Sequence, residues 1–100
     1  MPSQPPAEKM DLDDVTEFLA RRSKLAHLRA RKRGSLITLE SGPLDDPVRH
    51  ARLRRLSVNY WTLECATHTG QWEPTGERDT FDGILELLTS TYPWVLEPVV

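Results

Sequence analysis

Apolar residues recur with helical spacing near the start of the chain. Four of them follow one another at i, i+3, i+6 and i+7, along one stripe of a helix: Leu12, Val15, Phe18 and Leu19. Three aspartates within residues 11–14 lie where carboxylates cap free N–H groups, and basic side chains follow where the last turn favours cations. The pattern predicts a helix from about Leu12 to Ser23.

Residues 25–33 fit two patterns. A helix continuing to Arg33 would take Gly34 as its C-cap, whereas strict alternation of side chains is typical of a strand. The strand would place Leu28, Ala30 and Lys32 on one side, and His27, Arg29, Arg31 and Arg33 on the other. We favour a hairpin, because Gly34-Ser35 gives a tight turn into a β-branched strand over residues 36–40 that needs a local partner.

A loop rich in Gly, Pro and Asp leads to a third strand, expected from Val48 or Arg49 to Val58. The alternation slips in the middle of this strand, where the apolar residues change parity: Ala51 and Leu53 before, Leu56 and Val58 after. One extra residue near Arg54-Arg55 would restore a single apolar face, so we predict a β-bulge there.

The next alternating segment predicts a fourth strand over residues 60–67, with Trp61, Leu63 and Cys65 on one face. After a turn we expect a short fifth strand over residues 71–73, which ends at Pro74 because proline lacks the N–H that a strand ladder needs. Residues 75–79 are then expected to form a loop.

A second helix is predicted to begin with Asp79 or Thr80 as its N-cap and to end before Pro93. Its apolar residues again follow the helical period: Phe81, Ile84, Leu85 and Leu88. The apolar segment over residues 94–96 is expected to dock on the core.

The predicted architecture is a two-layer α+β fold: an antiparallel meander of four to five strands with an N-terminal and a C-terminal helix on one face. Residues 1–10, which contain three prolines, are expected to form a disordered tail, and residues 11–100 a single domain.

Composition narrows the class of protein. A chain of 100 residues with 38% hydrophobic residues suits one small domain with one core. Its single cysteine excludes an intramolecular disulfide framework. No apolar run approaches 18 residues and the N-terminus does not resemble a signal peptide, so we expect no membrane segment and a cytoplasmic location.

The sequence offers little chemistry for catalysis. Cys65 and His68 are the strongest enzyme pair, but residues three apart on a strand point to opposite faces, so a buried inert thiol is the favoured interpretation. A zinc site would need His27, His50 and His68 to converge from separate elements. The acidic pairs fit helix capping and turns. We therefore expect no catalytic residues, no metal and no cofactor, although an enzyme using Cys65 with a histidine from elsewhere stays an alternative.

Charge is strongly segregated along the chain. Residues 21–55 carry a local balance of +8, flanked by −4 over residues 1–20 and −6 over residues 56–100, so the formal net charge of −2 conceals a basic middle. On a strand, alternate arginines project every ~6.6–6.8 Å, close to the spacing of successive phosphates. The candidate anion-binding residues are Arg29, Arg31, Arg33, Arg49, Arg52, Arg54 and Arg55.

Two interpretations of this basic segment stay open. Its arginines would either bind an anionic partner, a nucleic acid or an acidic protein, or fill a solvated sheet face and pair with acidic residues of the same chain. A related alternative is a structural or self-associating protein, in which the basic face of one copy meets an acidic face of another.

Aromatic residues supply a second candidate surface. Tyr60, Trp61, Trp72 and Trp94 would serve as stacking platforms for bases if they lay on an open sheet face. The shared parity of Trp61 with Leu63 and Cys65 favours the core instead, with Trp72 packed beside Trp61.

The segment Trp61-Thr62-Leu63, followed by Gly70-Gln71 and then Trp72, resembles a motif of a family of small uncharacterised bacterial proteins. In that family a helix precedes an antiparallel meander with a W-x-L strand, a second Trp and a closing helix. The order is similar here from about Asp11 to Leu96, but Glu64-Cys65 replaces the aromatic residues expected at the strand centre. The resemblance implies a bacterial protein of this architecture and no activity.

We therefore expect a small non-catalytic interaction module. Its Arg-rich sheet face would make charge-assisted contacts with an anionic partner, and affinity would fall as salt rises.

Overall fold

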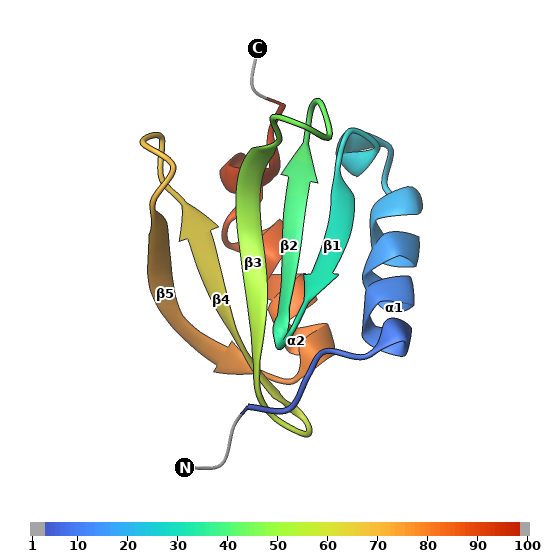
Figure 1. The fold of residues 1–100 in the computed structure, drawn as a ribbon, viewed down its shortest axis with the longest axis vertical. Helices are drawn as coiled ribbons and strands as arrows, with labels where there is room; N and C mark the ends of the chain where they lie inside the picture. The colour runs from blue at the N-terminus through green and yellow to red at the C-terminus, as the bar shows by residue number, and fades with distance from the viewer. Residues whose placement is uncertain (1–3, 99–100) are drawn as a thin grey trace.

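The computed structural model describes residues 4–98, which form a five-stranded antiparallel meander with a helix on either side of it in sequence (Figure 1). The elements are α1 (Lys9–Ala20), the 3₁₀ segment η1 (Ser23–Leu25), β1 (Arg29–Arg33), β2 (Leu36–Ser41), β3 (Val48–Ser57), β4 (Tyr60–Ala66), β5 (Trp72–Asp79), α2 (Phe81–Ser90) and the 3₁₀ segment η2 (Pro93–Leu96). The predicted α+β fold is confirmed.

The hydrophobic core lies between the sheet and the helices. In Figure 1, α2 and η2 lie behind the sheet and α1 lies along β1, while no helix covers the face of the sheet towards the viewer. The largest fully buried side chains come from both layers: Val15, Ile37, Leu39, Leu53, Trp61, Leu63, Ile84, Leu88 and Leu96. The sheet therefore has one face in the core and one open face.

The first helix begins three residues earlier than predicted. The Glu8 side chain accepts from the backbone of Asp11, and the Asp11 carboxylate accepts from the Glu8 N–H at 2.8 Å, so a capping box starts α1 at Lys9. Ala7 is buried and donates its N–H to Gly34 O at 2.8 Å. Residues 4–10 are thus packed on the domain and do not form the expected tail, of which residues 1–3 lie outside the described part.

The hairpin is confirmed over β1 and β2, with Gly34 in the turn at a φ of 58°. A positive φ is nearly free of strain only for glycine, which accounts for the residue at this point. His27 is a correction, because it precedes β1 and does not share a strand face with the arginines. Its ring lies 2.7 Å from Leu96 O and holds η2.

The bulge in β3 occurs one residue later than predicted. The pairing with β4 shifts between Arg55 and Ser57, so Leu56 is the extra residue. It does not restore an apolar face: Arg55 stays opposite the buried Trp61, and Val58 lies in the following turn with 79% of its surface exposed. A second, unpredicted bulge inserts His50 between Arg49 and Ala51, opposite β2.

The fifth strand is the main error of the sequence prediction. β5 runs through Pro74 to Asp79, because an edge strand can leave one side of a residue unpaired and so tolerates proline. Gly76, at a φ of 83°, lies where the pairing with β4 shifts. The loop predicted over residues 75–79 is therefore strand, and the helix follows it directly.

The second helix agrees with the prediction. Thr80 is the N-cap, its Oγ1 accepts from Gly83 N at 3.2 Å, and the four predicted apolar residues are buried. The predicted docking of residues 94–96 holds for Leu96, which is buried, but Trp94 is 61% exposed. Within residues 4–98 no helix is both long and apolar enough to cross a membrane.

Candidate anion-binding face

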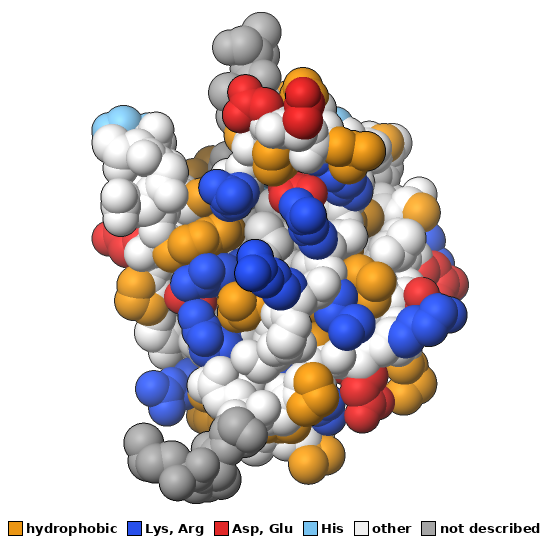
Figure 2. All heavy atoms as spheres, viewed as in Figure 1, with side chains coloured by type: hydrophobic (Ala, Val, Ile, Leu, Met, Phe, Trp, Pro, Cys, Tyr) orange, Lys and Arg blue, Asp and Glu red, His pale blue; other side chains and the backbone are white. Residues whose placement is uncertain are grey.

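Arginine side chains gather on the open face of the sheet. The register places on this face six of the seven predicted arginines, and Arg78 of β5 joins them opposite Thr62. We call this set the basic face: Arg29, Arg31, Arg33, Arg49, Arg52, Arg54 and Arg78. Figure 2 shows Lys and Arg side chains over the strands, with Asp and Glu mostly towards the rim. Arg78 was missed because residues 75–79 were predicted to be a loop.

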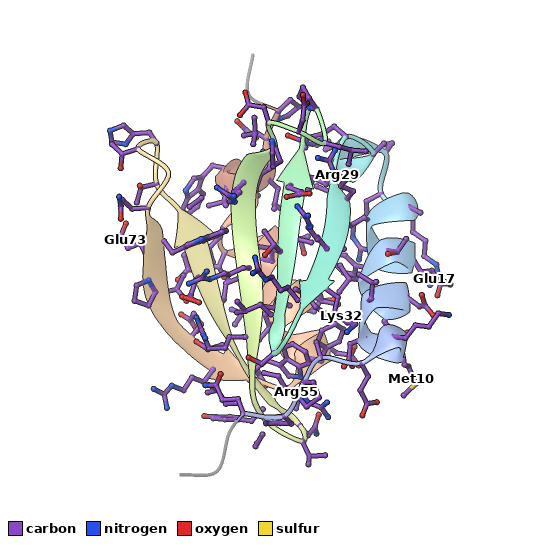
Figure 3. The ribbon with its side chains drawn as sticks, in the orientation of Figure 1. Met10, Glu17, Arg29, Lys32, Arg55 and Glu73 are labelled. Atoms are coloured by element: carbon purple, nitrogen blue, oxygen red, sulfur yellow. The ribbon has the colours of Figure 1, made fainter. Side chains whose placement is uncertain are left out.

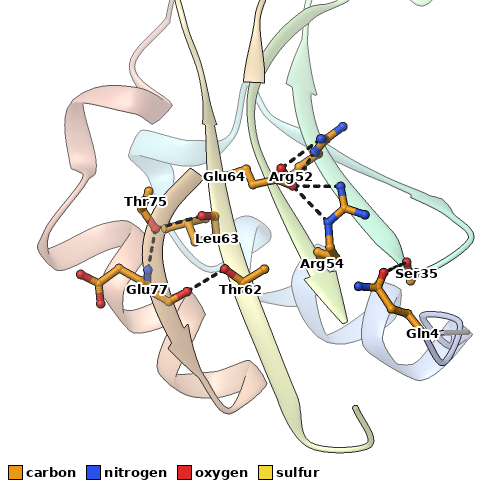
Figure 4. A network of polar contacts seen from close by, with 9 residues as sticks. All are labelled: Gln4, Ser35, Arg52, Arg54, Thr62, Leu63, Glu64, Thr75 and Glu77. Carbon is orange, nitrogen blue, oxygen red and sulfur yellow. Dashed lines mark hydrogen bonds and ion pairs between the residues drawn. The ribbon is translucent and has the colours of Figure 1, made fainter. Parts of the chain in front are cut away.

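A buried carboxylate lies beneath two of these arginines. Arg52 donates from Nε and Nη2 to the two oxygens of Glu64, at 2.9 and 3.0 Å (Figure 4). Arg54 donates from Nε and Nη2 to Glu64 Oε1, at 3.3 and 3.2 Å. The Glu64 side chain is only 11% exposed. One carboxylate thus holds two guanidinium groups in fixed positions.

A second buried carboxylate, that of Glu40 on β2, pairs with two arginines of β1. Arg29 donates from Nε to Glu40 Oε1 at 3.2 Å, and Nη1 of Arg31 lies 3.8 Å from the same oxygen. Arg29 also donates from Nη1 to Gly42 O at 2.6 Å. The Glu40 side chain is 4% exposed. Internal pairing, the alternative left open by the sequence, therefore applies to four arginines of the face.

The electrostatics of Glu64 show which effect dominates beneath these arginines. Burial by itself would raise the pKa of Glu64, because it penalises the charged form. The hydrogen bond from Arg52 and the charges of Arg52 and Arg54 oppose it, and the pKa of Glu64 lies below its ordinary value. The carboxylate is therefore firmly ionised at neutral pH.

The pairing leaves the face strongly positive. Arg33, Arg49 and Arg78 are exposed, and none makes a side-chain hydrogen bond or ion pair to another described residue. Seven guanidinium groups share the face with Glu40 and Glu64, a surplus of five positive charges. Each buried carboxylate is also shared by two arginines, so N–H groups remain for an external anion.

An aromatic ring lies within the basic face. Trp72 is half-buried opposite Ala66, on the open side of the sheet, and the Arg52 guanidinium lies over its ring, 4.5 Å from the ring centre. The expected packing of Trp72 against Trp61 is wrong. Trp61 contacts Phe81 in the core, with ring centres 4.7 Å apart. The pairing of Trp72 with Ala66 in the β4–β5 ladder places the Trp72 side chain on the open side of the sheet, away from Trp61.

Arg55 does not belong to the basic face. It lies on the core side, at the lower end of the sheet in Figure 3, which also labels Arg29. Its guanidinium donates to three backbone carbonyls, those of Pro6, Ser57 and Val58, at 2.8, 3.3 and 2.8 Å. Its Nη1 also lies 3.7 Å from Glu8 Oε1. Arg55 is thus a structural clamp between the N-terminal segment and the β3–β4 turn.

Cys65 is the candidate nucleophile of the enzyme alternative. Burial, together with the charge of Glu73, raises the pKa of the Cys65 thiol. Cys65, His50 and His68 do line one open cavity of about 750 Å³, but no imidazole hydrogen-bonds the thiol. Across residues 4–98 no group of three or more metal-ligating side chains comes together.

No family model, curated protein or solved structure matches this chain. The resemblance to a bacterial family therefore stays a prediction.

Proposed function

We propose that this protein is a small non-catalytic interaction module that binds an anionic partner, a nucleic acid or an acidic protein, through the basic face. The observation that carries the proposal is the surplus of five positive charges on a sheet face that no helix covers. Such a surface attracts polyanions and raises their association rate. We place the protein in the cytoplasm of a bacterium, where both kinds of partner occur.

The internal ion pairs support binding rather than cancel it. Arg52 and Arg54 are held in place by Glu64, and Arg29 by Glu40 and Gly42 O, so little side-chain entropy is left to lose when a partner binds. Arg33 and Arg49 supply unengaged N–H donors beside them. A guanidinium fork suits phosphate and carboxylate oxygens equally well.

A fluorescence anisotropy titration tests the proposal. Labelled single-stranded and double-stranded nucleic acids and polyaspartate are titrated at about 50 and 200 mM salt. If about five anionic groups are contacted, affinity for a single strand falls about a hundredfold between these concentrations, since the logarithmic slope is about −0.7 per phosphate.

Two double variants locate the binding surface. Arg33→Glu with Arg49→Glu reverses the charge of two exposed arginines of the face, and we expect affinity to fall at least tenfold. Arg21→Glu with Lys24→Glu makes the same change in net charge outside the face, on exposed residues after α1, and is the matched control. Failure of every polyanion to bind at low salt, or equal losses in both variants, would contradict the proposal.

Self-association is a second candidate, favoured by the acidic side chains of the helices. Asp14 and Glu17 of α1 and Asp82 and Glu86 of α2 line one shallow hollow on the helix side of the molecule. Arg21 and Arg22 line the same hollow, so four acidic and two basic side chains leave it a net charge of −2, opposite in sign to the basic face. Sedimentation velocity at low salt separates the candidates, because a self-associating chain sediments faster as its concentration rises, and added salt reverses the effect.

A further inference from the structure

The most specific feature of the basic face is the contact between Arg52 and Trp72. The Arg52 guanidinium lies over the indole ring, and its two hydrogen bonds to Glu64 keep it from turning away. The close-up in Figure 4 shows Glu64 between Arg52 and Arg54, all on the same side of the strands. A planar cation held against an aromatic ring offers a base a stacking surface and a charge together.

The width of the basic face favours single-stranded over double-stranded nucleic acid. Five strands at a spacing of about 4.8 Å span about 19 Å between the outer strands, whereas the major groove of a duplex is about 12 Å wide and admits one helix or a two-stranded ribbon. The face is therefore too wide to enter the major groove of an undeformed duplex. An unpaired strand has no such limit, because it lies across the sheet with its bases turned to the protein.

The positions of the charges fit the same geometry. The unengaged Arg33 lies on the edge strand β1, and Arg78 lies on the opposite edge strand β5. Thr38 and Thr62 occupy the open face between them, so small polar side chains separate the cationic positions. Phosphates have donors at both sides of the sheet, while the aromatic surface lies between β3 and β5.

We propose that the partner of the basic face is single-stranded nucleic acid, with at least one base stacked on the Arg52–Trp72 pair and the phosphates bound by the surrounding arginines. This inference rests on the proposed function of the same face and narrows it. An acidic protein would be bound by the arginines without a need for the aromatic ring.

The test compares three probes: a mixed-sequence single strand of about 12 nucleotides, the duplex of the same sequence, and polyaspartate. We expect the single strand to bind at least tenfold more tightly than the duplex, and to quench the tryptophan fluorescence. Trp72→Leu should weaken single-strand binding about tenfold, the loss expected for one stacked base. Trp72→Phe should restore most of it. Trp94→Leu, which removes an exposed tryptophan from η2, is the control and should leave binding unchanged.

The outcomes separate this inference from the proposed function. Equal affinity for duplex and single strand, or an unchanged affinity in folded Trp72→Leu, overturns the stacking inference and leaves anion binding in place. Tighter binding of polyaspartate than of the single strand favours an acidic protein and also overturns it. No binding of any probe overturns both. Circular dichroism of each variant confirms that its fold is retained.

Discussion

Glu64 determines how two arginines of the basic face are held. We expect Glu64→Gln to lower the free energy of unfolding by about 1–2 kcal/mol, because it removes a charged acceptor from two half-buried guanidinium groups. Urea denaturation measures the change. Glu73→Gln, at an exposed position on β5, is the control and should have little effect.

The acid sensitivity of the fold follows from the same residue. The pKa of Glu64 is lower in the folded chain than in the unfolded chain, so the unfolded state binds protons first as the pH falls. The stabilisation is complete above about pH 4.5, the ordinary value, and is lost as the pH falls through the lowered pKa. The loss below pH 4.5 should be smaller in Glu64→Gln, and an identical profile would contradict the assignment.

Cys65 offers a test of the non-catalytic interpretation. Burial raises the pKa of its thiol, and the thiolate is the reactive form, so we expect slow alkylation of the native protein at pH 7. Unfolding in urea should bring the rate to that of a free cysteine. Fast native labelling would instead point to an activated thiol and revive the enzyme alternative.

At the level of single residues, the alternation along β1 predicted which side chains share a sheet face, but not which acidic side chains are buried. Alternation placed Arg29, Arg31 and Arg33 together, as the register confirms. The burial of Glu40 and Glu64 beneath these arginines had no signal in the sequence, because it depends on which strands pair. Arg55 was assigned to the basic face, but it alternates regularly with Leu53 and so lies on the core side, because the bulge comes after it, at Leu56.

At the scale of elements, the Arg55 clamp holds the N-terminal segment to the sheet. We expect Arg55→Met to leave three carbonyls without their donor and to lower the free energy of unfolding by about 2 kcal/mol. Hydrogen exchange of the Ala7 N–H, which donates to Gly34 O, should speed up more than that of the strands. Arg33→Met, which replaces an exposed arginine of β1, is the control and should leave the exchange of the Ala7 N–H unchanged.

The segment η2 is held by two imidazoles. The ring N–H groups of His50 and His27 donate to Val95 O and Leu96 O, at 2.9 and 2.7 Å, since a carbonyl only accepts. Burial lowers the pKa of His50, the bond to Val95 raises it, and the nearby His27 lowers it, with a net decrease. The unfolded chain therefore gains a proton first on acidification.

The consequence is a second pH dependence, which sets in at a higher pH than that of Glu64. The contribution of His50 is complete above about pH 6.5, the ordinary value, and declines as the pH falls towards the lowered pKa. Thermal unfolding should thus show a lower Tm at pH 5.5 than at pH 7.5, and His50→Asn should flatten this difference. A Tm that rises on acidification through this range would refute the neutral buried imidazole.

Helices and strands were well predicted where the spacing of apolar residues followed one period without interruption. α2 was predicted because its helical spacing left no competing pattern. Residues 25–33 also fitted a helix, and the β1–β2 hairpin was predicted because the strand over residues 36–40 needed a local partner. The full length of β5 was not predicted. A proline such as Pro74 would end a central strand but is tolerated on an edge strand, and the sequence alone does not show that β5 lies at the edge.

For the whole molecule, one hydrophobic cluster joins both helices to the central strands. We expect Leu53→Ala, at a fully buried position of β3, to lower the free energy of unfolding by about 3 kcal/mol. Tryptophan fluorescence and far-ultraviolet circular dichroism should report the same transition midpoint in the wild type and the variant. Separate midpoints would show that the helices and the sheet unfold independently.

Pro74 and Gly76 of β5 have a final consequence for the behaviour of the protein in concentrated solution. Pro74 presents no N–H at its position, Gly76 interrupts the regular pairing, and charged neighbours such as Glu73 and Arg78 follow the same edge. At the other edge, α1 lies alongside β1 (Figure 1). Neither side of the sheet is a good template for a strand from another molecule, so the chain is protected against fibril growth while its broad face stays free for recognition.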